Sequence, residues 1–405
     1  MTNIGQFDIK ELAVNYGTPL YVYDKSAILS NYNKLIGTFK KYYEKTKVHY
    51  SVKANSNVHI LQIFNEIGCG VDCSSPFEVQ LAKYAGFPDD KIIYTGNYES
   101  QSDFSQIADY NIKINLDDIT SFKRLNQINK TDVISFRINP GIGKGGYEGI
   151  TTGGTDAKFG VPYEKAVHAY EVVKSEGYKR FGIHMMTGSN NLEPYYFAQV
   201  VEKLMMIAGN IFDKLGTVPE YVDIGGGFGI PYEDDDEVLD MELTARLVTE
   251  VFQEKCQKYG FGQPELLMEP GRYLVGNAGW LISKVTGIKH SYKHFVGVDA
   301  GMSTLLRPAL YGAKHRTYIY GKTIPEMNVN LCGQICENSD IFVKNIFLPT
   351  AEEGDIVVMR DAGAYGYAMS SNYNNRPKPA EVLLDGDTAK VIRRKENFED
   401  MLSLY

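Results

Sequence analysis

The first two-thirds of this chain alternates short apolar runs with amphipathic stretches, and this alternation constrains the fold more than any other feature. The apolar runs are mostly continuous, as is typical of strands buried on both faces of a parallel sheet. We expect eight strands, at residues 48–53, 68–72, 91–95, 112–116, 133–139, 181–187, 220–224 and 265–269. Eight strand–helix repeats favour an α/β fold of the (β/α)8 TIM-barrel type. An open, doubly wound sheet is the alternative that the same pattern allows.

Two of the intervening stretches carry clear helix signals. Ser75-Pro76-Phe77-Glu78 predicts a helix start, because serine is a favoured cap, proline suits the first turn and a glutamate follows three residues after the cap. Gly86 is the expected end of that helix. Residues 240–259 carry apolar side chains at helical spacing and are followed by Gly260, which predicts a second helix.

After about residue 272 strand-like runs dominate and helix signals fade. We expect strands at 281–288, 294–299, 328–335, 355–360, 380–384 and 389–393, with Asp385-Gly386 as a hairpin turn between the last two. The early run Leu20-Tyr21-Val22-Tyr23 precedes the first helix and could add a strand to this all-β part. The predicted domains are therefore a barrel over residues 25–272 and a β-sandwich or β-barrel built from residues 1–24 and 273–405.

Composition excludes several classes of function. The net charge of −8 argues against nucleic acid or an anionic membrane surface as the main partner. No apolar run is long enough to span a bilayer, and the N-terminus lacks a signal-peptide pattern. Five cysteines are few for 405 residues, and no Cys/His set completes a zinc pattern. We therefore expect a cytoplasmic protein without a bound metal ion.

Side chains suited to chemistry fall at the C-terminal ends of predicted barrel strands, where barrel enzymes place their active sites. They are Lys53, Asp72, Arg137, His184 and Glu269. A lysine amine in a partly dry pocket loses its proton more readily and can form a Schiff base. Most lysines at strand ends are simply solvated, so the presence of all five residues at strand ends is more informative than Lys53 alone.

Two further motifs follow the last two barrel strands. The run Gly225-Gly226-Gly227 would let backbone N–H groups approach an anion closely, at the usual phosphate site of such barrels. A tight turn without any ligand is the alternative. Glu269 requires a cationic or N–H partner if it is buried, and either a protonated pyridine nitrogen or nearby Arg272 would serve.

Taken together, these segments resemble the fold-type III pyridoxal-phosphate decarboxylases, a class with an alanine racemase-like fold, and most closely the diaminopimelate decarboxylases. The matching motifs run in order over nearly the whole chain: Tyr50-Ser-Val-Lys53-Ala-Asn55, Gly70-Val-Asp72-Cys-Ser74, Lys158-Phe-Gly160, Gly225-Gly-Gly227, Glu269-Pro-Gly-Arg272, Arg307-Pro-Ala-Leu-Tyr311, Cys336-Glu337 with Asp340, Gly363-Ala-Tyr365, and Met369 to Arg376 followed by Pro-Lys-Pro. An ordered set of this length is far more specific than any one motif.

The resemblance implies a lyase that uses pyridoxal 5'-phosphate. Lys53 would carry the cofactor as a Schiff base, and Glu269 would keep its pyridine nitrogen protonated. Racemases of this fold carry an arginine there, so a glutamate favours decarboxylation. The other residues implied to bind the cofactor are Asp72, Met186, Ser189, Gly225, Gly226, Gly227, Gly271, Arg272 and Tyr365.

The same resemblance implies how substrate is held. Arg272, Arg307 and Tyr311 would grip a distal carboxylate, together with Tyr365, and Glu337 would read a distal ammonium. Cys336 would act catalytically, as proton donor. In the family Cys336 and Glu337 come from the partner subunit, which implies a homodimer with a shared active site. The expected reaction is decarboxylation of meso-2,6-diaminopimelate to L-lysine and CO2, in lysine biosynthesis.

The chain departs from the family pattern in three places. Met186 stands where a histidine usually stacks on the cofactor ring, Ser74 to Glu78 replace the usual Gly-Gly before glutamate, and the loop 141–154 holds seven glycines in 14 residues, which suggests a mobile flap. These departures leave open another diamino acid, or a conjugated or carrier-bound amino acid, as substrate. A non-catalytic regulator or cofactor-holding protein is the alternative from another functional class.

Overall fold

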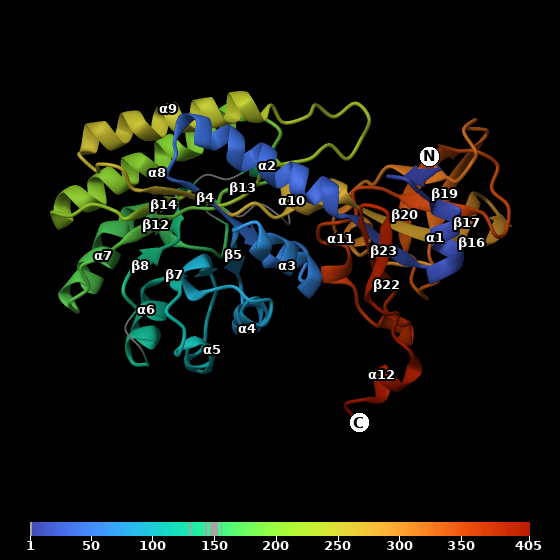
Figure 1. The fold of residues 1–405 in the computed structure, drawn as a ribbon, viewed down its shortest axis with the longest axis horizontal. Helices are drawn as coiled ribbons and strands as arrows, with labels where there is room; N and C mark the ends of the chain where they lie inside the picture. Colours follow the sequence, from blue (N-terminus) through green and yellow to red (C-terminus); the bar gives the residue numbers. More distant parts are fainter. Residues whose placement is uncertain (1, 129–130, 142–143, 146–152, 155) are drawn as a thin grey trace. The chain divides into compact units, whose positions relative to one another are not determined.

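The computed structural model describes residues 2–128, 131–141, 144–145, 153–154 and 156–405. Much of the expected flap at 141–154 therefore lies outside the described residues. The chain divides into two compact units (Figure 1). One comprises Asn31–Ile230 with Glu237–Tyr273, and the other comprises Met1–Ser30, Pro231–Asp236 and Leu274–Tyr405.

The first unit is a parallel barrel. Its eight strands are ordered β12-β14-β15-β4-β5-β6-β7-β8, and parallel bridges from Ile134 to Phe181 and from Arg137 to His184 join β8 to β12. This closure confirms the (β/α)8 prediction and shows the open-sheet alternative to be wrong. The strands are β4 (Thr46–Ser51), β5 (Gly70–Cys73), β6 (Ile92–Tyr94), β7 (Lys113–Leu116), β8 (Ile134–Phe136), β12 (Gly182–His184), β14 (Tyr221–Asp223) and β15 (Glu265–Met268).

Helices connect successive strands (Figure 1). They are α2 (Lys25–Tyr42), α3 (Val58–Glu66), α4 (Pro76–Tyr84), α5 (Gln101–Ile107), α6 (Ile119–Asn126), α7 (Ala166–Ser175), α8 (Pro194–Leu215) and α9 (Met241–Tyr259). The predicted start of α4 is confirmed: the Ser75 hydroxyl accepts a hydrogen bond from the Glu78 amide. The Glu78 carboxylate accepts one from the Ser74 amide at 2.6 Å, one residue earlier than in a standard capping box. Gly86 and Gly260 follow the two predicted helices with positive φ, as expected at a helix end.

Several strands end earlier than the apolar runs suggested. β4 stops at Ser51, and Val52–Ala54 form a single 3₁₀ turn, η1, so Lys53 lies just beyond the strand. The run 133–139 divides into β8 and β9 (Ile138–Asn139), and β9 pairs with β11 (Val161–Pro162) outside the barrel. The sequence stays apolar beyond the last paired residue of these strands, because these side chains are still buried at the end of the barrel where backbone pairing has stopped.

The barrel interior contains a large side chain. Tyr221 packs with Ile93, Val133 and Leu267, and its hydroxyl lies 3.2 Å from Asn115 Oδ1. A Cβ atom on Gly182 would come within 2.2 Å of Tyr221 Cζ. Glycine at this position in the neighbouring strand therefore leaves room for the ring.

The second unit is built on a nine-stranded sheet of order β20-β19-β17-β16-β3-β22-β23, with β21 paired to β16 and to β18. The early run forms β3 (Leu20–Asp24) between β16 and β22, which confirms that it joins the all-β part. The other strands are β16 (Gly279–His290), β17 (His294–Val298), β18 (Thr317–Ile319), β19 (Met327–Cys332), β20 (Ile341–Leu348), β21 (Ile356–Met359), β22 (Ala380–Asp385) and β23 (Thr388–Arg393). The Asp385-Gly386 hairpin is confirmed.

Sequence analysis missed β18 and β20. In β20 the polar pair Lys344-Asn345 interrupts the apolar pattern, and Asn345 has a φ of 53°. Backbone pairing with β19 holds the strand despite this interruption. Within the described residues, no helix combines the length and apolar character needed to cross a membrane.

Candidate active site

Lys53 and Asp72 form an ion pair at the C-terminal end of the barrel. Lys53 Nζ lies 2.7 Å from Asp72 Oδ2 and 3.3 Å from Ser74 Oγ. Lys53 follows β4 and Asp72 lies in the neighbouring strand β5, with Ser51 opposite Asp72 in the ladder. The Lys53 side chain is 45% exposed, whereas that of Asp72 is fully buried. Burial and the nearby Glu269 raise the pKa of Asp72, and the Lys53 charge opposes that rise.

Ser51 joins this pair to the next strand along the sheet. Its Oγ lies 2.8 Å from the Glu269 carbonyl oxygen and 3.1 Å from Asp72 Oδ2. Because β4 lies between β15 and β5, one hydroxyl on β4 reaches both neighbours. The lysine-bearing turn and the residues after β15 are thereby fastened together.

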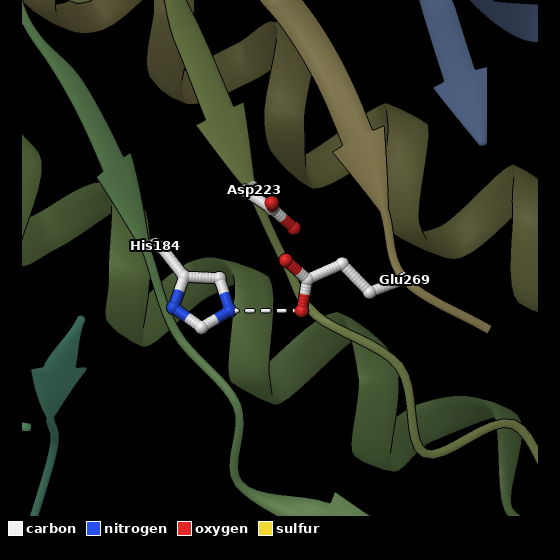
Figure 2. Close-up of side chains that lie close together, drawn as sticks. All are labelled: His184, Asp223 and Glu269. Atoms are coloured by element: carbon white, nitrogen blue, oxygen red, sulfur yellow. Dashed lines mark hydrogen bonds and ion pairs between the residues drawn. The ribbon is translucent and has the colours of Figure 1, made fainter. Parts of the chain in front are cut away.

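Glu269 is the centre of a buried cluster at the same barrel end (Figure 2). It follows β15, while His184 and Asp223 are the last residues of β12 and β14. His184 Nε2 lies 3.1 Å from Glu269 Oε2, and one ligand atom from each of the three side chains lies within 4.8 Å of the others. Asp223 Oδ1 accepts a hydrogen bond from the Gly225 amide at 2.9 Å.

The two carboxyl groups of this cluster differ in their charge. Burial disfavours ionisation of Glu269, but the His184 imidazole and its hydrogen bond hold the pKa of Glu269 well below its usual range. Burial and the adjacent Glu269 raise the pKa of Asp223 well above its usual range. The two shifts are opposite in direction, so the pair favours one negative charge over two.

The glycine run after β14 packs tightly against this cluster. Gly225 and Gly227 have φ values of 68° and 90°. A Cβ atom on Gly226 would lie 2.3 Å from the Glu269 carbonyl oxygen, so only glycine fits there. The Gly226 amide lies 3.1 Å from Met186 Sδ, which places the partly buried Met186 directly on this turn.

Three further site residues expected from the sequence lie in the barrel unit. Ser189 ends the short strand β13 (Gly188–Ser189), which pairs with β10 (Lys144–Gly145). Gly271 and Arg272 are buried, and Arg272 begins α10 (Arg272–Val275). Glu269 has His184 as a close partner, with 3.1 Å between Glu269 Oε2 and His184 Nε2.

The remaining expected residues belong to the β unit. Arg307 begins α11 (Arg307–Tyr311) and is buried, with Nη1 3.2 Å from His315 Nε2 and its guanidinium 4.7 Å from the centre of the Tyr232 ring. Tyr311 ends the same helix and is partly exposed. Tyr365 follows β21 and has a left-handed φ of 57°.

Cys336 and Glu337 are exposed on the loop between β19 and β20. The buried carboxylate of Asp340 anchors this loop by accepting hydrogen bonds from the Met302 amide at 2.5 Å and the Ile335 amide at 2.7 Å. The Cys336 amide donates to Asn374 Oδ1 at 2.7 Å. Asp340 was visible in the sequence only as part of a motif, and its anchoring role required the structure.

The barrel end has the groups that pyridoxal phosphate requires. An amine is available on Lys53, a buried anion that can accept a pyridine N–H is available on Glu269, and a glycine turn packed against Glu269 can approach a phosphate. His184, Asp223 and Glu269 are also of the types that coordinate divalent metals, although Asp223 would first have to lose its proton. The residues present therefore fit the cofactor.

The sequence gives no specific role to two members of this site. It places His184 among the strand-end side chains suited to chemistry, and Asp223 does not stand out from the glycine run that follows it. Both end a barrel strand, as Ser51 does, so their position at a strand end was the available signal.

Comparison with known proteins agrees with this geometry. Residues 29–276 match the family model described as "Pyridoxal-dependent decarboxylase, pyridoxal binding domain". The chain is 42% identical to the diaminopimelate decarboxylase of Methanothermobacter thermautotrophicus over 98% of this chain and 94% of the relative. It is 34% identical to the diaminopimelate decarboxylase of Bacillus subtilis, over 99% of this chain and 94% of the relative.

A solved structure shares the fold over the full length. The diaminopimelate decarboxylase of M. jannaschii, in complex with L-lysine, superposes with a TM-score of 0.91 at 32% identity, covering 99% of this chain and 95% of the other. With the barrel, the cofactor-compatible site and these matches in agreement, the chain belongs to the family of pyridoxal-dependent decarboxylases.

Proposed function

We propose that this protein decarboxylates meso-2,6-diaminopimelate to L-lysine and CO2, using pyridoxal 5'-phosphate. The observation that carries the proposal is that Lys53 and Glu269, whose pKa is held well below its usual range, lie at one barrel end. They are connected through Asp72, which pairs with Lys53, and Ser51, which contacts both Asp72 and the Glu269 carbonyl oxygen. The names of the relatives support the choice of substrate, as does the L-lysine in the M. jannaschii and Helicobacter pylori structures.

When bound, pyridoxal phosphate supplies an electron sink that accepts the electron pair released as CO2 leaves the α-carbon. Lys53 would hold the cofactor through its amine. Glu269 would accept the pyridine N–H and keep that nitrogen protonated, which strengthens the sink. The amides of the Gly225–Gly227 turn and the Ser189 hydroxyl would bind the phosphate, with Gly271 and Arg272 beside it.

Asp72 would retain and orient the Lys53 amine. Their 2.7 Å ion pair fixes Nζ at the barrel mouth, while the partial exposure of Lys53 leaves the amine accessible to an incoming amino acid. Met186, on the glycine turn, would contact the face of the cofactor through its thioether.

Substrate recognition would use the β unit. We propose that Arg307, Tyr311 and Tyr365, with Arg272, bind the distal carboxylate, that Glu337 reads the distal ammonium, and that the Cys336 thiol returns a proton to the α-carbon. The exposure of Cys336 and Glu337 on an anchored loop suits residues that complete the active site of a second subunit, so we propose a homodimer.

We also propose a cytoplasmic location, because the cysteines are all free thiols.

Met186 favours a second candidate substrate class. A thioether does not supply the titratable ring that a stacking histidine would, and it adapts to different neighbours. This feature would suit another diamino acid, or a conjugated or carrier-bound amino acid, in the same reaction. If Glu337 reads a distal ammonium, Glu337→Ala should impair diamino substrates more than simple amino acids.

The test is to incubate cofactor-loaded protein with meso-diaminopimelate and to measure CO2 and lysine. We expect turnover in the wild type and none in Lys53→Ala. Lys47→Ala is a matched control, because Lys47 lies near the opposite end of the same strand and is 46% exposed, close to the 45% of Lys53. It should retain activity.

Bound cofactor without turnover of this substrate would direct the search to the second class. Cofactor without turnover of any amino acid would support a non-catalytic protein, and failure of borohydride to fix the cofactor on Lys53 would overturn the assignment of the site.

A further inference from the structure

We infer that His184 and Asp223 are positioning residues that hold Glu269 as the single anion facing the cofactor's pyridine nitrogen: His184 donates Nε2–H to one oxygen, and Asp223 presents its own proton. This inference rests on the proposed function, and it assigns roles to two residues that do not themselves touch the substrate. It identifies what makes one buried carboxylate able to keep a ring nitrogen protonated.

The geometry isolates these three side chains from water. His184 and Asp223 are fully buried and Glu269 is 5% exposed, so the three side chains depend on protein groups for their hydrogen bonds. Glu269 Oε2 has His184 Nε2 at 3.1 Å, and the other side of the carboxylate faces Asp223 (Figure 2). Glu269 Oε1 also has Thr95 Oγ1 at 3.4 Å. Glu269 therefore keeps acceptor capacity for a further donor such as a pyridine N–H.

The hydrogen bonds of Asp223 show why it should carry a proton. Its Oδ1 accepts the Gly225 amide, but its buried Oδ2 has no donor among the described residues. An ionised oxygen in that position would be desolvated and would face the Glu269 carboxylate (Figure 2). A proton on Oδ2 removes the repulsion and supplies Glu269 with a second donor.

The surrounding charges agree with one anion in the pair. Asp72 on β5 already engages Lys53, which follows β4. Arg137, between β8 and β9, lies over the Phe159 ring at 4.3 Å and interacts most strongly with Asp117. From β4, His49 stays neutral because burial lowers its pKa to about 3. Arg137 also acts on Glu269 and Asp72, and among the described residues no cation is paired with Asp223.

Removing the proton donor at Asp223 should therefore reduce the protonation of the pyridine nitrogen that faces Glu269. Loss of the donor raises the proton affinity of Glu269. The proton then moves from the ring nitrogen toward the carboxylate, and the ring becomes a weaker electron sink. The effect should fall on kcat, because the interaction serves the reacting centre and not substrate binding.

The first test replaces Asp223 with asparagine and with leucine. Asparagine can accept the Gly225 N–H through Oδ1 and donate to Glu269 through Nδ2, so Asp223→Asn reproduces the protonated aspartic acid. Asp223→Leu has similar bulk and no donor. Cofactor labelled with ¹⁵N in the pyridine ring is loaded into each variant, and the chemical shift reports the protonation of that nitrogen.

We expect a protonated nitrogen in wild type and Asp223→Asn, and a shift toward the unprotonated form in Asp223→Leu. In Asp223→Leu kcat should fall roughly 10- to 100-fold, as expected for the loss of a hydrogen bond to a buried charge, with little change in KM. The inference is overturned if Asp223→Asn behaves like Asp223→Leu, or if the nitrogen stays protonated in both.

His184 allows a parallel comparison. Glutamine can place an amide nitrogen close to the position of the imidazole Nε2, so His184→Gln should retain the protonated nitrogen and much of kcat. His184→Leu should lose both. Equal loss in the two variants would show that the donated hydrogen bond is not what matters.

The apoprotein provides a test that does not depend on the cofactor. Above about pH 4 an unfolded aspartate releases its proton while folded Asp223 keeps it, so the contribution of Asp223 to the free energy of unfolding falls as pH rises. Asp223→Asn lacks this penalty and should gain stability relative to the wild type between pH 4 and 7. A difference that does not change with pH would overturn the inference, whereas a wild type that takes up no cofactor would defeat the proposed function alone.

Discussion

Lys53 Nζ lies 2.7 Å from Asp72 Oδ2, and the two residues of this pair differ sharply in exposure: Asp72 is fully buried while Lys53 is nearly half exposed. A buried carboxylate loses its hydration and depends on its partner, whereas an exposed ammonium can be solvated by water. Breaking the pair from either side should therefore have opposite effects on stability.

Asp72→Asn should leave the apoprotein as stable as the wild type or more stable, because it removes a buried charge whose pKa burial raises. Lys53→Met should destabilise it, by about 1–3 kcal/mol, because Asp72 is left buried without its partner. Both should lose turnover. Urea titration of the two apoproteins at pH 7 measures the difference, and equal destabilisation would contradict the asymmetry of the pair.

Gly226→Ala should abolish tight cofactor binding. A Cβ atom there would lie 2.3 Å from a backbone oxygen of Glu269, and neither chain segment can yield by a side-chain rotation. We expect the glycine turn to shift away from Glu269, with at least a tenfold weaker cofactor affinity, roughly the effect of losing one hydrogen bond to a charged group.

Gly37→Ala is the control for that substitution. Gly37 lies in α2, and a Cβ atom there would meet no atom within 4 Å, so alanine should be neutral or slightly stabilising. Cofactor titration followed by absorbance compares the two variants. Unchanged affinity in Gly226→Ala would show that this turn does not bind the phosphate.

Asp340→Ala should impair catalysis while leaving the structure of the barrel unchanged. It removes the acceptor of the Met302 and Ile335 amides and so releases the loop that carries Cys336 and Glu337. We expect a loss of about 1–3 kcal/mol in stability and a fall in kcat, with normal cofactor absorbance. The exposed Asp387 supplies a control, Asp387→Ala, that should change neither. Full kcat in Asp340→Ala would remove this loop from the active site.

His49 should make the protein sensitive to acid. Burial is the main reason that its folded-state pKa is lowered to about 3, with nearby Lys113 adding to the effect. Between about pH 6.5 and 3 the unfolded chain binds a proton at this residue and the folded chain does not, so stability falls as pH falls. The slope is at most about 1.4 kcal/mol per pH unit.

His49→Gln removes this titrating group and should flatten the dependence of stability on pH over that window. Urea midpoints measured between pH 4 and 7 provide the comparison. Parallel curves for the two proteins would show that His49 is not the group responsible.

The apolar runs predicted the barrel strands because strands buried on both faces must be apolar throughout, and the cap at Ser75 predicted α4 because its hydrogen bond is local. β20 was missed because it is held by pairing with β19, a contact between residues distant in sequence. The turn at Lys53 was read as strand because its apolar neighbours pack without pairing.

The sequence by itself determined the barrel, the all-β unit and the strand-end positions of Lys53, Asp72 and Glu269, since these follow from local periodicity and ordered motifs. Only the tertiary structure decided which groups meet there. Ser51 touches both Asp72 and Glu269, and His184 and Asp223 converge on Glu269 from two other strands. Barrel closure brings these chain segments into contact, and burial then decides which carboxyl keeps its proton, because the cost of desolvating a charge depends on neighbours that lie far away in the sequence.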